Sequence, residues 1–297
     1  MMKSSAPEGT TQSLVDIITG GQGNDLITGG SGRDTAVFAG DADDFTIAIN
    51  SDGALDIINR ASANETDNVS FVEVIEFADG EMLDLHSITG ILDNSTEDLD
   101  VLIEMYIAYF NRAPDALGLY FWGSAFANGT SLEEIAELFL DQDETRETYP
   151  ADATNLDFAT QVYSNVLGRT PDQEGLNFWQ EQLDSGSVTR GGFILEVLRG
   201  AKADPEEGAT QEFIDLQLAD QSYLASKTDI GTYYAAIKGM SDVPSASAAM
   251  QLYVRGDASS IQTAVDRIDL DFENAAQATE GALLLPLIGL VDDPFLV

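Results

Sequence analysis

The sequence contains no cysteine and only one histidine, His86, among its 297 residues. Disulfides, thiol catalysis and cysteine-ligated metals are therefore excluded, and so is any site that needs two imidazoles. Basic residues are also scarce, because 13 Lys and Arg stand against 52 Asp and Glu, for a formal net charge of −39. Such a chain repels phosphate backbones, so we expect no nucleic acid partner.

Long apolar runs are absent as well. No run reaches the ~18 residues that a membrane span needs, so we expect no transmembrane segment. The polar segment 1–12, which we predict to be mobile, has no apolar core of a signal peptide. The most apolar stretch, Leu283–Val291, is interrupted by Pro286 and Gly289. It is either a terminal segment docked on the core or a targeting signal.

Two tandem nonapeptides stand out among the residues that are present. Gly20–Thr28 and Gly29–Val37 share the pattern Gly-Gly-x-Gly-x-Asp-x-U-x, in which U is apolar. Glycines allow the positive φ of tight turns, and each Asp supplies a hard carboxylate oxygen. Calcium takes six to eight oxygen ligands, more than one nine-residue loop supplies, so an ion would lie between two stacked loops. The apolar U residues, Ile27 and Ala36, would form a thin core.

This pattern resembles the RTX (repeats-in-toxin, hemolysin-type) family of calcium-binding proteins, which form parallel β-rolls. The resemblance implies calcium (Ca2+) as the cofactor and places the metal ligands at Gly21, Gly23, Asp25, Gly30, Gly32 and Asp34. Asp16 and Asp43 extend the same nine-residue register. In the family, loops eighteen residues apart share an ion, which pairs Asp16 with loop 29–34 and Asp43 with loop 20–25. The alternative interpretation is a flexible Gly/Asp-rich loop.

Alternating apolar residues then predict antiparallel strands up to about Leu85. The expected strands and turns are Phe45–Ile49, the turn Asn50–Gly53, Leu55–Ile58, Val69–Phe77, the turn Ala78–Gly80 and Met82–Leu85. This segment resembles the antiparallel β-cap that follows RTX repeats, which gives a predicted calcium β-roll plus cap over residues 13–90. The acidic segment Asp93–Asp100 is interpreted as a linker or a helix N-terminus.

From Val101 the apolar period becomes helical, and one pattern occurs twice. Asn111–Trp122 and Gly168–Trp179 share Arg-x-Pro-Asp-x-x-Gly-Leu-x-Phe-Trp, 57 residues apart. The signature resembles the family named domain of unknown function 4214, which implies a secreted or surface-layer setting and no particular reaction. We predict a duplicated helical domain over 98–275.

The signature also has an explanation in helix chemistry. Thr170 is expected to cap a helix that begins at Pro171, and Arg112 and Arg169 to bind carbonyls or carboxylates. The equivalent Trp122 and Trp179 are interpreted as core anchors, with a sugar-stacking platform as the alternative. Ser131 opens a capping box for a helix through Leu140. Residues 269–280 imitate an EF-hand but have a helical pattern, so we do not expect a calcium site there.

The predicted fold class is α+β multidomain, with a short parallel β-roll and cap followed by helices. The tail, 281–297, resembles the C-terminal signal of type I secretion. The predicted protein is a secreted, extracellular or cell-surface, calcium-binding structural protein that is not an enzyme. It would use the type I export machinery and contact cell-surface polysaccharide or other surface proteins.

Two alternatives remain open at this point. One is an adhesin or glycan-binding protein that uses exposed aromatic side chains. The other is the export module of a hydrolase with a carboxylate pair, since Asp and Glu are abundant although the sequence has no His-Glu-x-x-His or Gly-x-Ser-x-Gly motif.

Overall fold

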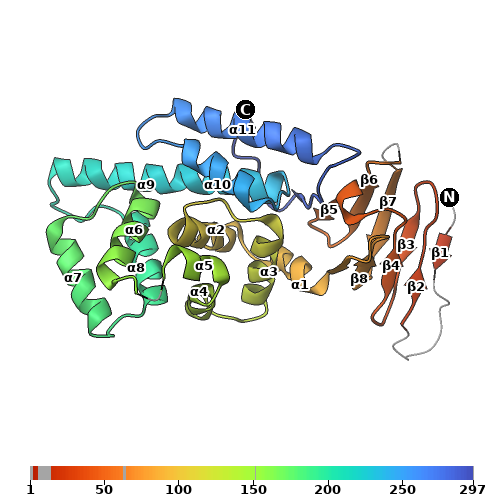
Figure 1. Cartoon of the computed structure of the whole chain (residues 1–297), viewed down its shortest axis with the longest axis horizontal. Helices are drawn as coiled ribbons and strands as arrows, with labels where there is room; N and C mark the ends of the chain where they lie inside the picture. Colours follow the sequence, from red (N-terminus) through yellow and green to blue (C-terminus); the bar gives the residue numbers. More distant parts are fainter. Residues whose placement is uncertain (1–2, 6–14, 63–64, 151, 297) are drawn as a thin grey trace.

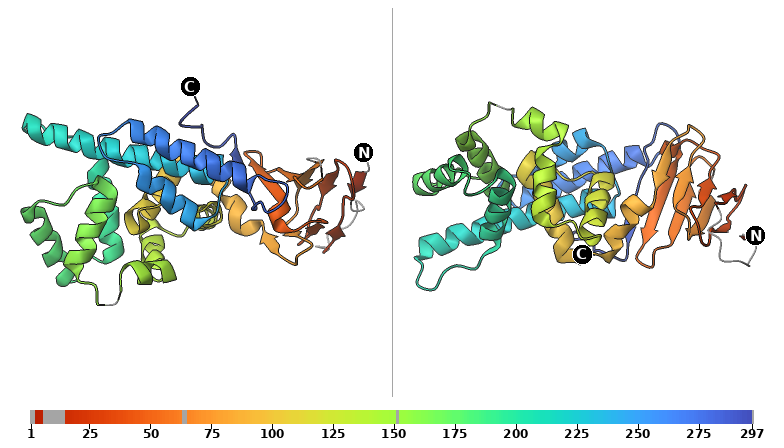
Figure 2. Two further views of the ribbon diagram at one scale, coloured as in Figure 1. Left: turned by 45° about the horizontal axis from the view of Figure 1, so that its top comes forward. Right: turned by 90° about the horizontal axis from the view of Figure 1, so that it is seen from below.

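The computed structural model of the chain describes residues 3–5, 15–62, 65–150 and 152–296. Its architecture is α+β, with strands at the N-terminal end and helices after them (Figure 1). The two views of Figure 2 show the same order along the long axis, from the sheets to the helical layers. None of the described helices has the length and apolar character that crossing a membrane requires.

The described residues form ten strands in two sheets. They are β1 (Lys3–Ser5), β2 (Ile17–Ile18), β3 (Leu26–Thr28), β4 (Thr35–Val37), β5 (Phe45–Asn50), β6 (Leu55–Asn59), β7 (Glu65–Ser70), β8 (Val74–Glu76), β9 (Met82–Asp84) and β10 (Leu287–Ile288). One sheet has the order β1-β3-β7-β6-β5-β10, and the other has the order β2-β4-β8-β9.

The strands of the nonapeptide register alternate between the two sheets. β2 pairs in parallel with β4, which begins eighteen residues later, with Ile17 opposite Thr35, while β3 lies in the other sheet. The apolar U residues Ile18, Ile27 and Ala36 are all buried. The thin core predicted between the short strands is therefore present.

A purely parallel β-roll is not confirmed, because both sheets are mixed. β3 pairs in parallel with β7 and β4 with β8, but β5–β6–β7 and β8–β9 are antiparallel. The single strand predicted over Val69–Phe77 is divided at Phe71, which has a φ of 53°. The backbone turns there so that β7 and β8 continue different sheets, which a local apolar pattern does not reveal.

In the described residues, eleven α-helices lie between β9 and β10. They are α1 (His86–Thr89), α2 (Thr96–Phe110), α3 (Ala116–Ala127), α4 (Leu132–Leu140), α5 (Asp143–Thr148), α6 (Asn155–Leu167), α7 (Gln173–Asp184), α8 (Arg190–Lys202), α9 (Gln211–Thr232), α10 (Val243–Leu252) and α11 (Ser259–Ala275). Shorter turns of 3₁₀-helix occur at Ala42–Asp44 (η1) and Gly90–Asp93 (η2), and α9 continues into a π-helical turn, Tyr233–Ile237 (η3).

The duplication appears as two successive helix triplets, α2–α3–α4 and α6–α7–α8. Ser95 and Ser131 form capping boxes at α2 and α4, so the acidic segment before α2 is a helix N-terminus and the Ser131 prediction is confirmed. The predicted Thr170 cap is wrong. Asp172 caps α7, because its carboxylate accepts the Gly175 N–H at 2.8 Å. Asp115 caps α3 in the same way.

Helix α11 covers the positions that imitate an EF-hand. Asp269 accepts a hydrogen bond from the Tyr233 hydroxyl at 2.7 Å and pairs with Lys238, so it stabilises helix packing. A calcium loop would need a turn at Asn274, but α11 continues through this residue. The sequence expectation that this segment is helix is therefore confirmed as far as Ala275, where α11 ends.

The C-terminal segment docks against both parts of the molecule. Leu284, Leu285 and Leu287 are buried, and β10 pairs in parallel with β5. The Tyr120 hydroxyl of α3 donates to the carbonyls of Leu285 and of Ala235 in η3. The segment thus joins the edge of the larger sheet to the helices.

The N-terminal segment 1–12, predicted to be mobile, is described only in part. Lys3–Ser5 form β1, which pairs in parallel with β3. Residues 1–2 and 6–12 lie outside the described part of the chain, as do residues 13 and 14 at the start of the predicted roll.

Candidate functional site

The two Gly/Asp loops are shaped by glycine. Gly21, Gly23, Gly30 and Gly32 all have positive φ, between 99° and 149°. Three of these four, Gly21, Gly23 and Gly30, have no atom within 4 Å of where a Cβ would lie. Backbone conformation therefore explains these glycines, as the turn pattern predicts.

Each loop ends in a carboxylate that is turned inward. In the described part of the chain, the Oδ2 atoms of Asp25 and Asp34 are buried and have no hydrogen-bond partner. Asp34 is fully buried, and its Oδ1 accepts the backbone N–H of Asp16 at 2.8 Å. A buried carboxylate oxygen without a partner is costly, so this position is suited to a cation.

Further carboxylates, from β7 and from the bend before β8, lie beside these loops. Asp67 of β7 accepts the Asp25 N–H at 2.7 Å, and Glu73 accepts the Asp34 N–H at 2.7 Å. Burial raises the pKa of Asp67, and the negative charges of Asp25 and Glu65 raise it further. The hydrogen bond from the Asp25 N–H lowers this pKa but does not outweigh the other effects. Concentrated negative charge again favours a cation. The sequence reasoning missed Asp67 and Glu73, because only the parallel pairing of β7 and β8 with β3 and β4 brings them here.

The two outer aspartates of the nine-residue register, Asp16 and Asp43, lie in different parts of the structure. Asp16 lies beside Asp34, and its carbonyl accepts the Thr35 N–H at 2.8 Å, as expected for loops eighteen residues apart. Asp43 lies elsewhere, in η1, where its carboxylate accepts the Leu283 N–H at 3.1 Å. The expected pairing of Asp43 with loop 20–25 is not formed, because β7 rather than β5 is the neighbour of β3.

The donor set fits calcium in part. Among the described residues, no group of three or more His, Asp or Glu side chains is arranged as a metal site. Each loop instead offers one inward carboxylate together with the carbonyls of a glycine turn. Carboxylate and carbonyl oxygens are the ligands that calcium prefers, so backbone oxygens would have to complete the coordination.

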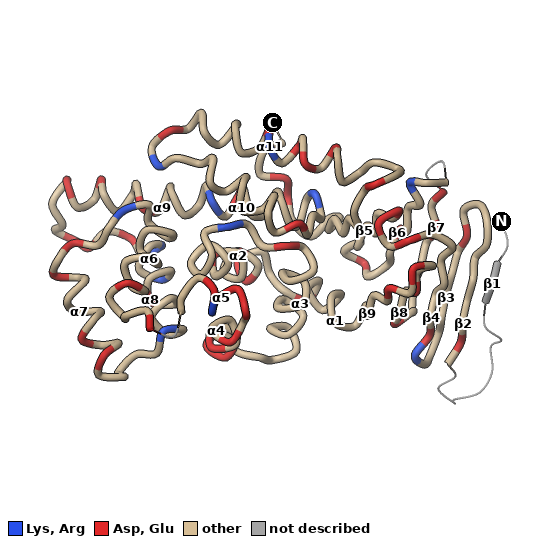
Figure 3. The backbone as a smooth tube through the Cα atoms, in the orientation of Figure 1, with Lys and Arg blue, Asp and Glu red and all other residues tan. Residues whose placement is uncertain are grey.

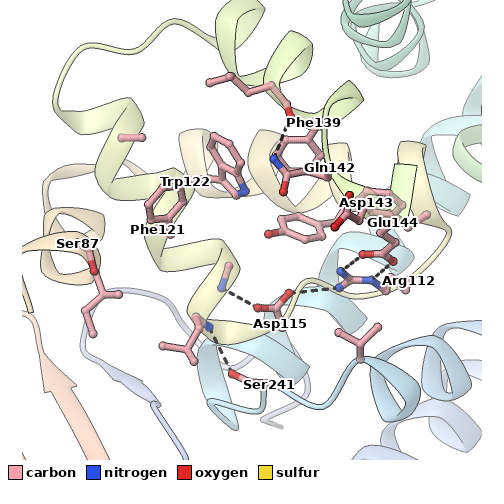
Figure 4. A pocket seen from close by; sticks show the side chains of 18 of the residues that line it. Ser87, Arg112, Asp115, Phe121, Trp122, Phe139, Gln142, Asp143, Glu144 and Ser241 are labelled. Atoms are coloured by element: carbon pink, nitrogen blue, oxygen red, sulfur yellow. Dashed lines mark hydrogen bonds and ion pairs between the residues drawn. The ribbon is translucent and has the colours of Figure 1, made fainter. Parts of the chain in front are cut away.

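A second candidate lies in the helical part, where a cavity of about 1170 Å³ opens beside α3 and α5. Figure 4 shows Trp122 and Phe121 on one side and Arg112 with Glu144 and Asp115 on the other. Arg112 is almost fully buried and binds both oxygens of Glu144 at 2.7 Å. Its guanidinium also lies 5.0 Å from the centre of the Tyr106 ring.

These polar groups are already engaged with one another. Burial by itself would lower the pKa of Arg112. The hydrogen bonds to Glu144 and the negative charges of Glu144 and Asp115 outweigh burial, so the pKa of Arg112 is raised. The Asp115 carboxylate accepts the Gly118 N–H at 2.7 Å, and a Cβ on Gly118 would lie 2.4 Å from the Tyr106 hydroxyl. The signature residues therefore cap and pack the N-terminus of α3, which is a structural role.

The second copy repeats this arrangement. Arg169 binds Asp220 of α9 at 2.7 Å, so both signature arginines bind carboxylates, which is one of the two kinds of partner predicted for them. Trp179 donates its indole N–H to the Tyr163 hydroxyl at 2.8 Å. Trp122 and Trp179 are both half-buried, so they are partly core anchors and partly exposed surface.

A buried lysine joins the two copies. Lys227 of α9 is 1% exposed and donates to the Asn111 side chain and to the Asn165 carbonyl at 2.8 Å. Its ammonium lies 5.0 Å from the centre of the Tyr223 ring. Burial lowers the pKa of Lys227 to about 7. The ammonium therefore changes charge near neutral pH in the folded protein.

We expect this lysine to make stability depend on pH. Between the folded pKa of about 7 and the ordinary value of 10.5, the unfolded chain binds a proton that the folded chain has lost. The free energy of unfolding therefore rises with pH in this window, by at most about 1.4 kcal/mol per unit. Urea unfolding at pH 7, 8 and 9 measures the slope, and Lys227→Met should flatten it. An unchanged slope in the variant would contradict the assignment.

Comparison with known proteins gives one match. The family model described as a domain of unknown function (DUF4214) matches residues 136–202, from α4 to the end of α8. The matched range contains the second copy of the signature but not the first. No curated protein and no solved structure matches the chain. The match supports the predicted resemblance of the helical part.

Proposed function

We propose that the N-terminal β-structure binds calcium and folds with it, within a secreted or surface-associated protein that has no catalytic role. The observation that carries the proposal is the pair of buried, unpartnered Oδ2 atoms of Asp25 and Asp34 at the ends of glycine turns. The neighbouring carboxylates of Asp67 and Glu73 add negative charge that a cation would offset.

Calcium suits these loops better than magnesium does. Magnesium requires near-ideal octahedral geometry and gives up its water reluctantly, whereas calcium accepts irregular sets of carboxylates and carbonyls. A loop whose ligands are mainly backbone carbonyls has the irregular geometry that calcium tolerates. The proposed site is accordingly selective for the larger ion.

The proposal links folding to location. Calcium at about 100 times its dissociation constant adds ~2.7 kcal/mol of stability for each site that only the folded state forms. In a calcium-poor cytosol the loops would stay loose, and outside the cell they would fold. An export signal in 281–297 would be accessible only before folding, since Leu284, Leu285 and Leu287 are buried afterwards.

One observation favours a second candidate, recognition of a surface partner. Phe121 and Phe178 hold equivalent positions in the duplication and are 50% and 53% exposed. Exposed aromatic rings at repeated positions suit binding to a surface glycan or protein. This function would add to calcium binding rather than replace it.

Thermal unfolding of the full chain, followed by circular dichroism, tests the proposed calcium function. We expect calcium to raise the melting temperature by several degrees in a saturable way, since a change of 1 kcal/mol shifts a chain of this size by about 2 to 4 °C. Magnesium at the same concentration should have little effect. If both ions raised the melting temperature equally, or if calcium did not raise it, these loops would be turns without a calcium site.

A further inference from the structure

The duplication presents one surface twice, and the two copies differ in what covers them. The cavity beside α3 and the smaller cavity beside α7 are lined by residues 57 positions apart. The corresponding pairs include Tyr106 and Tyr163, Arg112 and Arg169, Trp122 and Trp179, and Phe139 and Glu196.

A helix of the chain itself covers the second copy. Phe213, Leu216, Gln217 and Asp220 of α9 line this cavity, and only about 210 Å³ is left open. Their spacing of three, four and seven residues places them on one face of the helix. Asp220 is 5% exposed and supplies the carboxylate for Arg169. One face of a helix therefore lies over this surface, with Asp220 buried and with Phe213 50% and Leu216 40% exposed at the edge.

The first copy stays open. Its cavity is about 1170 Å³, and the carboxylate for Arg112 comes from the short helix α5 instead. Apolar side chains at its edge remain in solvent, since Met82 is 62%, Phe121 50% and Leu138 44% exposed. Exposed apolar groups around a groove mark a surface that binds a partner.

The charge around the groove selects the kind of partner. Figure 3 shows Asp and Glu positions, in red, concentrated along α4 and α5. Residues 132–148 contain one arginine and seven acidic residues, of which Asp143 and Glu144 line the groove. The other five are Glu133, Glu134, Glu137, Asp141 and Glu147. Because Arg112 is already paired, an incoming helix needs no carboxylate. Lysine or arginine on its flanks would complement the rim.

We infer that the open copy of this surface binds a basic amphipathic helix of a partner protein, placed as α9 is placed on the second copy. Apolar side chains three and four residues apart would enter between Phe121, Trp122 and Leu138. Basic side chains would face the carboxylates of α4 and α5. Grooves of this kind recognise helices by such anchors.

A synthetic peptide tests the inference. The probe copies Gln211–Leu224 with Glu212→Lys, Asp215→Lys and, at the position that would face Arg112, Asp220→Ala, and its binding to the full chain is followed by fluorescence anisotropy. We expect saturable binding, at least tenfold weaker for the unsubstituted peptide and weaker in higher salt. Phe121→Ala should weaken binding about tenfold or more. Phe178→Ala, at the equivalent exposed position, should leave it unchanged.

The contrary results are equally specific. Equal losses in Phe121→Ala and Phe178→Ala, or no saturation by the basic peptide, would overturn the inference. Binding of a neutral oligosaccharide at Trp122 that the peptide does not displace would assign the groove to a glycan instead. Both phenylalanines are half exposed, so circular dichroism should show that the variants stay folded.

Discussion

Asp25→Asn and Asp34→Asn will raise the stability of the protein in a chelator and lower it in calcium. Without an ion, asparagine removes a buried charge that lies near Asp67 and Glu73, which should stabilise the fold by about 1 kcal/mol. With calcium at about 100 times its dissociation constant, loss of one site should cost ~2.7 kcal/mol. Urea unfolding in both conditions gives the two values.

This reversal of sign separates a metal ligand from a structural residue. Asparagine has the size of aspartate, and the Oδ1 that accepts the Asp16 N–H remains at position 34. A purely structural carboxylate would give the same change in both conditions. Asp43→Asn is the matched control, because the Asp43 carboxylate accepts the Leu283 N–H and binds no group of loop 20–25 in the described part of the chain. If Asp43→Asn also removed the calcium response, the proposed placement of the ions beside Asp25 and Asp34 would be wrong.

Gly239→Ala will displace the C-terminal segment from the molecule. Gly239 has a φ of 65°, and a Cβ there would lie 2.3 Å from backbone atoms of Leu285 and Pro286. The left-handed conformation alone costs alanine about 1 to 2 kcal/mol. The backbone clash and the exposure of three buried leucines bring the expected loss to roughly 3 to 5 kcal/mol. Urea unfolding measures the loss, and limited proteolysis shows whether the tail is released.

Gly256→Ala is the control for this change. Gly256 has a φ of 79°, but no atom lies within 4 Å of where its Cβ would be. This variant should therefore lose only the conformational part, about 1 to 2 kcal/mol. Equal losses in the two variants would mean that the tail contributes nothing to the folded state.

Local patterns predicted much of this molecule. The nine-residue spacing correctly placed Ile18, Ile27 and Ala36 in a common core, because strand side chains alternate and the turns are fixed by glycine. Helical periodicity and the repeated signature predicted a duplicated helical domain. The same signature predicted that Arg112 and Arg169 bind carbonyls or carboxylates. For the strands and helices the signal lies within a few residues of the feature, whereas the carboxylates that bind Arg112 and Arg169 are 32 and 51 residues away.

These local patterns could not predict which strands pair over long distances in the sequence. Asp67 and Glu73 reach the loops only because β7 and β8 pair with strands about 40 residues earlier, and Phe71 turns the chain between the two sheets. Asp43 was misplaced for the same reason, since the register continues in sequence but not in space. The packing of Leu284–Leu287 depends on β5, more than two hundred residues away.

The sequence patterns also did not predict the difference between the two copies of the duplicated surface. The repeated signature is the same in both, but α9 covers the second copy while the cavity of the first copy is open. The distinction lies in Phe213, Leu216 and Asp220, which stand outside the repeated motif.

Hydrogen exchange of the full chain, with calcium and with a chelator, tests the central claim most directly. We predict that calcium strongly slows amide exchange in residues 15–37 and in β7 and β8, and has little effect on α6–α8. Magnesium should not reproduce this protection. Protection that is unchanged by calcium in residues 15–37, or that appears only in the helices, would contradict a calcium-dependent β-structure.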